Sequence, residues 1–336
     1  MRLLKKKITI LGGGSWGITL ADLLCRNGHN VSVWEFSKIQ AHQLQQKRQL
    51  MVMPHLILSP KIMITQNIDE ACEGAAVIVC AVPSEHMRAT AQLLADHHLS
   101  VDDKIIVSAA KGIENNSYLR MSEVISSIFP TCYNRIAAIS GPSHAEEVSK
   151  GVPTAVVAAS ADIKIAQAVQ HIFNNKYFRV YTNTDIIGVE LGGSLKNILA
   201  IGCGICDGLH MGDNTKAALI TRGLTEMTRF GIKCNAKAET FSGLSGIGDL
   251  VVTCTSKFSR NRLIGEKLGQ GIKTKQALQQ MTMVAEGVPT AKAVYTRSKQ
   301  MKLELPITEQ VYAVIYKNKN PRKAIAQLML RKPKHE

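Results

Sequence analysis

Aromatic residues and long apolar runs are scarce in this sequence, and both observations narrow the class of protein. Phe, Trp and Tyr make up 5% of the 336 residues, so Ala, Ile, Leu and Val must fill the core, as they do where helices cover a parallel sheet. No uncharged apolar run reaches the roughly 18 residues that a membrane-spanning helix needs. We therefore expect an α/β protein without a membrane span.

Cysteine is present, but its distribution does not predict disulfides. The eight cysteines are scattered, and several of them, such as Cys25, Cys80 and Cys254, lie in apolar segments. Cys203 and Cys206 have the spacing of a redox or metal pair, but no second pair or histidine follows at ligand spacing. Because free cysteines are commonly buried, we interpret them as packing residues and predict no metal site. Reduced thiols are typical of a cytoplasmic protein.

Acidic residues are the minority. The sequence has 26 acidic and 41 basic residues, a formal net charge of +15, which can attract nucleic acid, a membrane surface or small anions. Apart from terminal runs at 5–7 and 331–334, the basic residues are spread along the chain, without the interleaved aromatics of single-strand binders. We therefore expect phosphorylated small molecules, and not nucleic acid, as ligands. The basic start resembles a signal peptide, but the glycines at 12–14 interrupt its apolar stretch.

Apolar runs alternate with helical patterns through the first half of the chain. The predicted strands are Ile8–Leu11, Val31–Glu35, Ile62–Thr65, Ala76–Ala81, Ile105–Ala109, Ile136–Ser140 and Thr154–Ala159, and the predicted helices include Trp16–Arg26, Glu85–His97 and Tyr118–Ser127. This alternation predicts a right-handed, doubly wound parallel sheet of Rossmann type. Near Asn183–Ile187 the pattern changes to long helical segments separated by glycine-rich turns. We predict a Rossmann-like domain over residues 1–185 and an all-α domain over residues 186–336.

Three glycines follow the first predicted strand and open the first predicted helix. Gly12, Gly14 and Gly17 have the GxGxxG spacing of a dinucleotide site. The first glycine permits a tight turn, the second lets the backbone approach a pyrophosphate, and the third lets the helix pack on the strand. The pyrophosphate then lies at the helix N-terminus. The motif predicts that the protein binds NAD or NADP.

The residues near the end of the second strand leave the choice of cofactor open. Glu35 stands about 20 residues after the glycines, where an acidic side chain holds the ribose hydroxyls of NAD. Ser32, Ser37 and Lys38 lie close by, and a hydroxyl with a cation suits the 2′-phosphate of NADP. Both cofactors are consistent with this segment.

Later strand ends carry further candidate groups. Pro83, Lys111 and the segment Gly141–Ser143 each follow a predicted strand. Ligands of open α/β sheets bind at the carboxyl ends of the strands. We therefore expect Lys111 to take part in the site, although a lysine in another position would be taken as a surface residue.

A lysine lies in an unusual place in the second half of the chain. Lys196 and Asn197 belong to an apolar, glycine-rich predicted helix. Burial of an unpaired ammonium is costly, so we expect Lys196 to face a polar cavity or to be neutral. Further on, Arg260 and Asn261 open a predicted helix that ends at Gly269. An arginine and an amide at a helix N-terminus suit a phosphate group.

Together these segments resemble the bacterial NAD(P)-dependent glycerol-3-phosphate dehydrogenases. The resemblance is carried by GGGSWG at 12–17, AKG at 110–112, SGPSHAEE at 140–147, GGSLKN at 192–197, GDLVVTCT at 248–255, SRNR at 259–262, AEG at 285–287 and LPIT at 305–308. The segments run in the family's order across nearly the whole chain. The resemblance implies interconversion of dihydroxyacetone phosphate and sn-glycerol 3-phosphate, which supplies phospholipid synthesis, and it is compatible with a homodimer.

The resemblance also implies a set of site residues. The cofactor would contact Gly12, Gly14, Ser15, Trp16, Gly17, Phe36, Lys111, Ala145, Arg260, Val284 and Glu286. The substrate would contact Lys111, Gly141, Ser143, Lys196, Asp249, Ser259, Arg260 and Asn261. Two positions depart from the family. Phe36 stands where the family often has Arg or another polar residue, which weakens a preference for NADP, and His144 stands where it often has Phe, which favours packing over a catalytic imidazole.

Lys196, Lys111 and Asp249 would be the catalytic residues. Hydride reduction of a ketone leaves an alkoxide that needs a proton, and Lys196 would supply it if Lys111 and partial burial lower its pKa. Asp249 would orient Lys196, Lys111 would polarise the carbonyl, and Arg260 with Asn261 would hold the phosphate.

Three alternatives to this function remain at the level of sequence. The first is another dehydrogenase of the 3-hydroxyacid or 6-phosphogluconate type, in which a Rossmann domain is also paired with a catalytic lysine ahead of an Asn. The others are a non-catalytic NAD(P)-binding regulator and, because of the charge of +15, a nucleic-acid binder. The segments at 248–249 and 259–261 favour the glycerol phosphate family.

Overall fold

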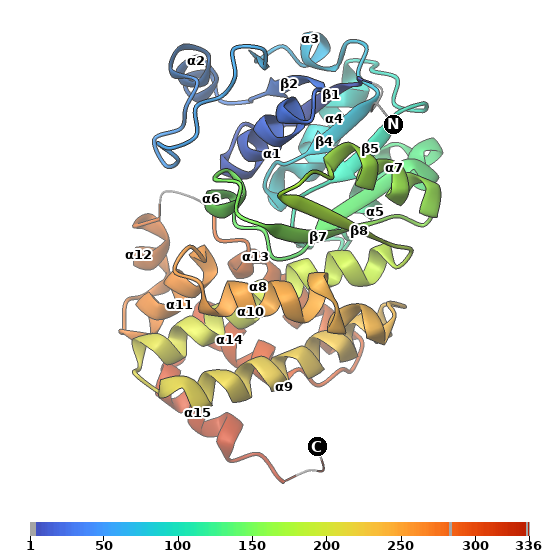
Figure 1. The fold of residues 1–336 in the computed structure, drawn as a ribbon. Coiled ribbons are helices and arrows are strands. Elements are labelled where there is room, and N and C mark those ends of the chain that lie inside the picture. The colour runs from blue at the N-terminus through green and yellow to red at the C-terminus, as the bar shows by residue number, and fades with distance from the viewer. Residues whose placement is uncertain (1–4, 282–283, 334, 336) are drawn as a thin grey trace. The chain divides into compact units, whose positions relative to one another are not determined.

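The computed structural model describes residues 5–281, 284–333 and 335. The first residues of the basic N-terminal segment and Lys334 of the C-terminal basic run lie outside the described residues. The chain divides into two compact units, and Figure 1 labels most of their elements. Unit 1 contains the described residues up to Lys111 together with Leu119–Glu190, and unit 2 contains Gly112–Tyr118 and the described residues from Leu191 onward.

Unit 1 is built on one sheet of eight strands in the order β3-β2-β1-β4-β5-β6-β7-β8. The strands are β1 Lys7–Leu11, β2 Asn30–Trp34, β3 Met63–Thr65, β4 Val77–Cys80, β5 Ile105–Ser108, β6 Ile136–Ser140, β7 Thr154–Ala159 and β8 Phe178–Asn183. The chain order reverses between β1 and β4, which is the switch point where open α/β sheets bind ligands. The Rossmann-like, doubly wound fold predicted from the sequence is confirmed.

The prediction of an entirely parallel sheet is wrong at one edge. Strands β1 to β6 pair in parallel, but β7 pairs antiparallel to β6 and β8 pairs parallel to β7. Between β6 and β7 lies only the four-residue helix α6, Ala145–Val148. A helix this short cannot act as the crossover that a parallel connection needs, so the chain returns in the opposite direction.

Strand β8 was not among the predicted strands. Its residues alternate between buried Phe178 and Val180 and exposed Arg179 and Tyr181. This period of two is the signature of a strand with one covered face. The strand lies at the end of the sheet, where polar and charged residues are common. Because of these polar residues, its sequence resembles that of the surrounding loops.

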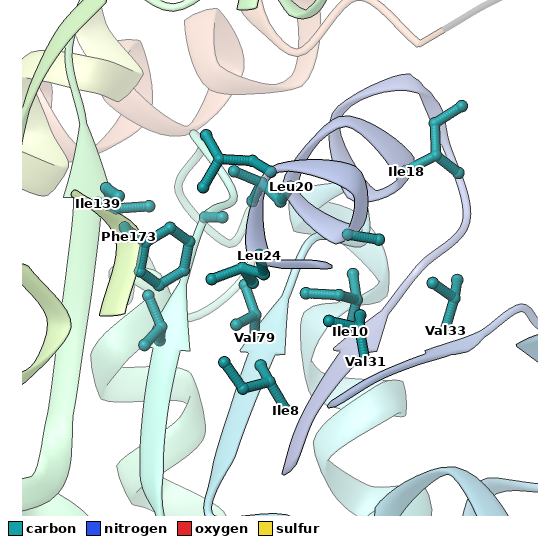
Figure 2. Close-up of a cluster of buried hydrophobic side chains, with 14 of the residues drawn as sticks. Ile8, Ile10, Ile18, Leu20, Leu24, Val31, Val33, Val79, Ile139 and Phe173 are labelled. Atoms are coloured by element: carbon teal, nitrogen blue, oxygen red, sulfur yellow. The ribbon is translucent and has the colours of Figure 1, made fainter. Parts of the chain in front are cut away.

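Helices cover both faces of the sheet in unit 1. They are α1 Ser15–Arg26, α2 Lys38–Lys47, α3 Ile68–Cys72, α4 Met87–Asp96, α5 Met121–Ile128, α6 and α7 Ile163–Phe173, with shorter helical turns at Ser84–His86 and Pro130–Arg135. Helices α1 and α7 contribute to one buried apolar cluster, and α3, α4 and α5 contribute to the other. Figure 2 shows the first cluster, in which side chains of α1 pack on β1, β2 and β4.

Unit 2 is helical, as the sequence predicts. Its helices are α8 Ile186–Gly208, whose first turn is counted with unit 1, α9 Gly212–Lys233, α10 Asp249–Thr255, α11 Arg260–Gly269, α12 Thr274–Gln279, α13 Gly287–Gln300, α14 Pro306–Lys317 and α15 Pro321–Met329, with helical turns at Ala238–Ser242 and Leu244–Gly248. By length and composition alone α8 could cross a membrane, but 89% of its most apolar window is buried. Its apolar character is therefore that of a core helix.

Glycines in α8 let other backbone segments approach it closely. A Cβ on Gly192 would lie 2.4 Å from the carbonyl oxygen of Ser245, and one on Gly204 would lie 1.9 Å from that of Arg262. Such distances are below any van der Waals contact, so larger residues would push the segments apart. The glycines thus bring α8 against the turn before α10 and against α11, which positions the polar side chains described next.

Candidate active site

The glycine-rich turn between β1 and α1 has the geometry of a dinucleotide site. Gly12 has φ of +107°, a conformation that side chains strongly disfavour, and its N–H donates to the carbonyl of Trp34 at 2.9 Å. A Cβ on Gly17 would lie 1.9 Å from the carbonyl oxygen of Gly12. The first and third glycines are therefore required by the fold itself.

The second glycine is different, because the packing of the protein itself does not require a glycine at this position. A Cβ on Gly14 would meet no atom within 4 Å, and Gly14 is exposed at the N-cap of the 12-residue helix α1 without a side-chain cap. The open space and the helix N-terminus together suit a pyrophosphate. The residues present therefore fit a nicotinamide dinucleotide.

The other expected cofactor residues of unit 1 are spread around this turn. Ser15 and Trp16 are the first two residues of α1 and are half-buried. Phe36 follows β2, is 81% exposed, and its ring lies edge-on to Trp34 with 6.2 Å between centroids. Ala145 begins α6 and packs against the apolar cluster under α1.

The carboxylate of Glu35 already has hydrogen-bond partners within the protein, which the sequence did not reveal. It accepts hydrogen bonds from the backbone N–H of Gly13 and of Ser37, both at 2.8 Å, and from the Gln40 side chain at 3.1 Å. The expected ribose contact would have to be made by a carboxylate that already binds the glycine-rich turn.

Three expected substrate residues of unit 1 meet at one carbonyl group. Lys111 Nζ donates to the backbone oxygen of Gly141 at 3.1 Å, and the Ser143 hydroxyl donates to the same oxygen at 2.9 Å. Gly141 has φ of +139°, and a Cβ there would lie 2.9 Å from the Cα of Val156 on β7. The strand ends thus bring Lys111, Gly141 and Ser143 together. His144, which follows, is the half-buried N-cap of α6.

The lysine of α8 has a buried polar environment. Lys196 is 5% exposed and Asp249, the first residue of α10, is 1% exposed. The ammonium forms an ion pair with the Asp249 carboxylate and donates to the Thr253 hydroxyl at 2.6 Å. The paired charges make burial of the ammonium tolerable, because an unpaired one would be strongly disfavoured.

Thr253 is the residue of this group that the sequence interpretation missed. It lies one helical turn after Asp249 in α10, and its hydroxyl donates to the Asp249 carbonyl at 2.6 Å. The hydroxyl hydrogen is thereby directed away from Lys196, and the oxygen is left to accept from the ammonium. The spacing of four residues could have indicated this shared helix face.

The start of α11 brings together two segments far apart in sequence. Ser259 caps this helix by accepting from the N–H of Arg262 at 3.2 Å. Arg260 is exposed and donates to the carbonyl of Val284 at 3.0 Å, while Glu286 stands at the N-cap of α13. Arg260 thus lies beside the late segment that the resemblance assigned to the cofactor.

Asn261 connects three helices and is 7% exposed. Its amide donates to the side-chain oxygen of Asn197 on α8 at 2.9 Å and accepts from the N–H of Gly287 on α13 at 2.9 Å. Since an amide has two N–H groups, one N–H remains beyond these two contacts. Asn261 therefore fixes the start of α11 beside Lys196 and the start of α13.

The CxxC pair of α8 consists of buried, free thiols. Cys203 is 0% and Cys206 is 1% exposed, and neither forms a disulfide. Burial raises the pKa of Cys206 to about 12. The reactive thiolate is therefore scarce at neutral pH, in keeping with the packing role that the sequence suggested.

A Rossmann-like unit with a dinucleotide turn and a helical unit with a buried lysine define the class of nicotinamide-dependent dehydrogenases that carry a helical second domain. Family models agree with both units. Residues 7–166 match the N-terminus and residues 185–326 the C-terminus of NAD-dependent glycerol-3-phosphate dehydrogenase. The chain belongs to this family and is an NAD(P)-dependent oxidoreductase.

Similar proteins extend over the full length of the chain. The glycerol-3-phosphate dehydrogenase [NAD(P)+] of Chlorobium phaeobacteroides strain BS1 is 48% identical over 332 residues, 98% of this chain and 99% of that protein. That of Geobacter sulfurreducens is 46% identical and covers 99% of both chains. The crystal structure of glycerol-3-phosphate dehydrogenase from Coxiella burnetii has a TM-score of 0.91 at 36% identity, covering 97% of this chain and 99% of that one.

Proposed function

We propose that this protein catalyses the reversible reduction of dihydroxyacetone phosphate to sn-glycerol 3-phosphate with a reduced nicotinamide dinucleotide. The observation that carries the proposal is the buried group of Lys196, Asp249 and Thr253, in a unit that matches the C-terminus of glycerol-3-phosphate dehydrogenase. A buried lysine held by fixed partners is suited to proton transfer, and its burial in an ion pair is weak evidence for a purely structural role.

The cofactor, when bound, supplies the hydride. Gly12, Gly14 and Gly17 would receive its pyrophosphate at the N-terminus of α1, for which the space over Gly14 is open. Ser15, Trp16, Phe36, Lys111 and Ala145 would complete its contacts in unit 1. Arg260, Val284 and Glu286 are the proposed contacts in unit 2, and the hydrogen bond from Arg260 to the carbonyl of Val284 holds two of them together.

Lys196 would exchange a proton with the substrate oxygen. Reduction places negative charge on that oxygen, and an ammonium stabilises the charge and then neutralises it by donating a proton. Asp249 and Thr253 both contact Nζ, so the position of the ammonium is set before substrate arrives. This preorganisation lowers the cost of orienting the donor during the reaction.

The remaining charged residues would orient the substrate. Lys111, held by the carbonyl of Gly141, would polarise the ketone oxygen together with Ser143. Arg260, Ser259 and the remaining N–H of Asn261 would bind the phosphate at the start of α11. The phosphate does not react, so its binding energy is available to place the ketone correctly.

A spectrophotometric assay tests the proposal. Purified protein should oxidise NADH, NADPH or both when dihydroxyacetone phosphate is added, and the reverse reaction should require sn-glycerol 3-phosphate. Dihydroxyacetone without the phosphate is the matched control, and it should react far more slowly because the site at Arg260 is then unused. Activity with 6-phosphogluconate or a 3-hydroxy acid, and none with dihydroxyacetone phosphate, would contradict the proposal.

Three further parts of the proposal concern the setting of the reaction. We expect the enzyme to work in the cytoplasm, to supply glycerol 3-phosphate for phospholipid synthesis and to form a homodimer. Complementation of a bacterial strain that lacks its own glycerol-3-phosphate dehydrogenase tests the metabolic role. Sedimentation equilibrium of the purified protein tests the dimer.

A further inference from the structure

We infer that Glu35 makes this enzyme prefer NADH over NADPH, because it keeps a fixed negative charge where the 2′-phosphate of NADPH would bind. The inference rests on the proposed function, in particular on the dinucleotide site at the turn after β1. The sequence left this choice open between Glu35 and the group of Ser32, Ser37 and Lys38, and the hydrogen bonds of Glu35 favour the first possibility.

Glu35 occupies the position whose side chain contacts the adenosine ribose in Rossmann folds. It directly follows β2, next to the switch point of the sheet. An acidic side chain there accepts a hydrogen bond from the ribose 2′-hydroxyl of NAD, whereas sites for NADP carry an arginine nearby. The chemistry at this position therefore decides whether a hydroxyl or a phosphate is accepted.

The carboxylate of Glu35 is held by three N–H donors and cannot turn away easily. Oε2 accepts from the backbone of Gly13 at 2.8 Å and from Gln40 Nε2 at 3.1 Å, and Oε1 accepts from the backbone of Ser37 at 2.8 Å. The residue is 8% exposed. Each carboxylate oxygen has two acceptor positions, so Oε1 retains one position that can accept from a ribose hydroxyl.

A rotation of Glu35 to admit a phosphate would break contacts within the turn itself. The Gln40 amide that donates to Glu35 also donates to the carbonyl of Gly13 at 3.0 Å. A Cβ on Gly13 would lie 2.9 Å from the Glu35 carboxylate, which shows how closely the side chain is packed against the turn. Movement of Glu35 would leave the N–H groups of Gly13 and Ser37 without their acceptor, and the loss is costly at Gly13, which is buried.

The surroundings of Glu35 provide little positive charge to offset a phosphate. Among residues 5–281, 284–333 and 335, no cation forms an ion pair with Glu35. Phe36, the next residue, presents an exposed apolar ring. Ser37 uses its hydroxyl to cap α2, accepting from the N–H of Gln40 at 3.3 Å, and Lys38 is exposed. One solvated lysine is a weak partner for a phosphate compared with a buried carboxylate that repels it.

The experiment measures dissociation constants of NADH and NADPH for the full-length protein by quenching of tryptophan fluorescence, without substrate. The wild-type protein should bind NADH at least about tenfold more tightly than NADPH, a modest difference for a site built for a hydroxyl. Glu35→Gln has the same shape without the charge and should reduce this ratio to near one. Gln40→Ala, the matched control, removes the two hydrogen bonds that the Gln40 amide donates to Glu35 and to the Gly13 carbonyl. It keeps the charge, so it should weaken both cofactors and preserve the ratio.

The ratio separates charge from structural damage, because a distorted turn would weaken the pyrophosphate contacts that both cofactors share. Equal or tighter binding of NADPH by the wild-type protein, or an unchanged ratio in Glu35→Gln, would overturn the inference. A shift of the ratio in Lys38→Ala that exceeds the one in Glu35→Gln would assign the selection to Lys38 instead. Lack of turnover with dihydroxyacetone phosphate would overturn the proposed reaction but leave this ratio measurable, and lack of binding of both nucleotides would overturn the cofactor site and the inference together.

Discussion

The turn after β1 and the lysine site of α8 serve one proposed reaction but are built in opposite ways. The turn is formed by backbone groups and depends on glycines. A Cβ at Gly17 would clash with the backbone, whereas the space beside Gly14 is open. The lysine site consists of side chains, which lie 53 residues apart in the ion pair of Lys196 and Asp249. A backbone site constrains which residues are tolerated locally, whereas a side-chain site depends on which helices meet.

The difference has a consequence for mutation. A substitution in the turn changes a conformation or fills a space, so it acts on folding and on cofactor binding together. A substitution in the lysine site changes a charge or a hydrogen bond, so it acts on turnover. The first three of the four predictions below test this separation, and the fourth concerns a buried carboxylate elsewhere in unit 2.

Lys196→Met should have the largest effect on the reaction. Loss of a positioned acid–base group typically lowers the rate by about 100- to 10,000-fold, and we expect kcat to fall in this range while the dissociation constant of NADH stays within about twofold, since the turn is untouched. Steady-state kinetics and fluorescence titration measure both quantities.

The control for Lys196→Met addresses the charge that it leaves behind. The variant removes the ammonium that neutralises the buried Asp249 carboxylate, and we expect this to destabilise the fold by several kcal/mol. The double variant Lys196→Met/Asp249→Asn removes both charges and should recover thermal stability without recovering kcat. Recovery of kcat in the double variant would show that Lys196 acts through folding alone.

Gly17→Ala should have the next largest effect, on folding as well as binding. The added Cβ would lie 1.9 Å from the carbonyl oxygen of Gly12, and a backbone clash of this kind costs about 1–3 kcal/mol or more. Chemical denaturation should show the loss. Gly14→Ala is the matched control, because its Cβ meets no atom within 4 Å. It should change stability by less than about 0.5 kcal/mol and weaken NADH binding, and equal destabilisation of both variants would contradict the assignment.

Thr253→Val should lower turnover moderately. It keeps the shape of the side chain but removes the hydroxyl that accepts from Lys196 at 2.6 Å. A hydrogen bond to a charged group contributes about 1.5–3 kcal/mol, so we expect kcat to fall by at least about tenfold. Thr253→Ser, which keeps the hydroxyl, should retain most of the activity. Full activity in the Val variant with a loss in the Ser variant would mean that the methyl group, and not the hydroxyl, matters.

Glu226 in unit 2 should give the smallest effect, visible only in pH dependence. Its buried carboxylate accepts from the backbone N–H groups of Ile307 at 2.6 Å and Thr308 at 3.1 Å. Burial raises the pKa of Glu226 above its ordinary value, although these donors oppose the shift. The Glu226 carboxylate thus accepts hydrogen bonds from backbone N–H groups at the start of α14, as the Glu35 carboxylate does from the glycine-rich turn.

The sign of the pH effect follows from the raised pKa of Glu226. Protonation favours the folded protein, so this contribution is complete below the unfolded-state pKa and is lost as the pH rises through the raised folded-state pKa. Wild-type stability, measured by denaturation relative to Glu226→Gln, should therefore decline as the pH rises across that range. A relative stability that increases with pH would contradict the assignment.

The features predicted from the sequence depend on neighbouring residues, and the features missed depend on contacts between distant segments. The glycine spacing and the alternation of strands and helices were correctly interpreted, because each depends on neighbouring residues. The direction of β7 was wrong and β8 was missed, since both depend on how a short connection and an edge strand meet the rest of the sheet. Thr253 was quoted within a motif but not assigned to Lys196, because a motif does not state which distant side chain its members contact.

Local chemistry along the chain was enough to specify a dinucleotide turn, a Rossmann-like unit and a helical unit, because glycine conformation and apolar periodicity act over a few residues. The partners of the charged groups were decided by contacts between distant segments. Glu35 meets Gly13 across 22 residues and Lys196 meets Asp249 across 53. A buried charge must be matched by whichever groups the packing brings to it, so only the folded chain defines the partners of the proposed proton donor and the proposed preference for NADH.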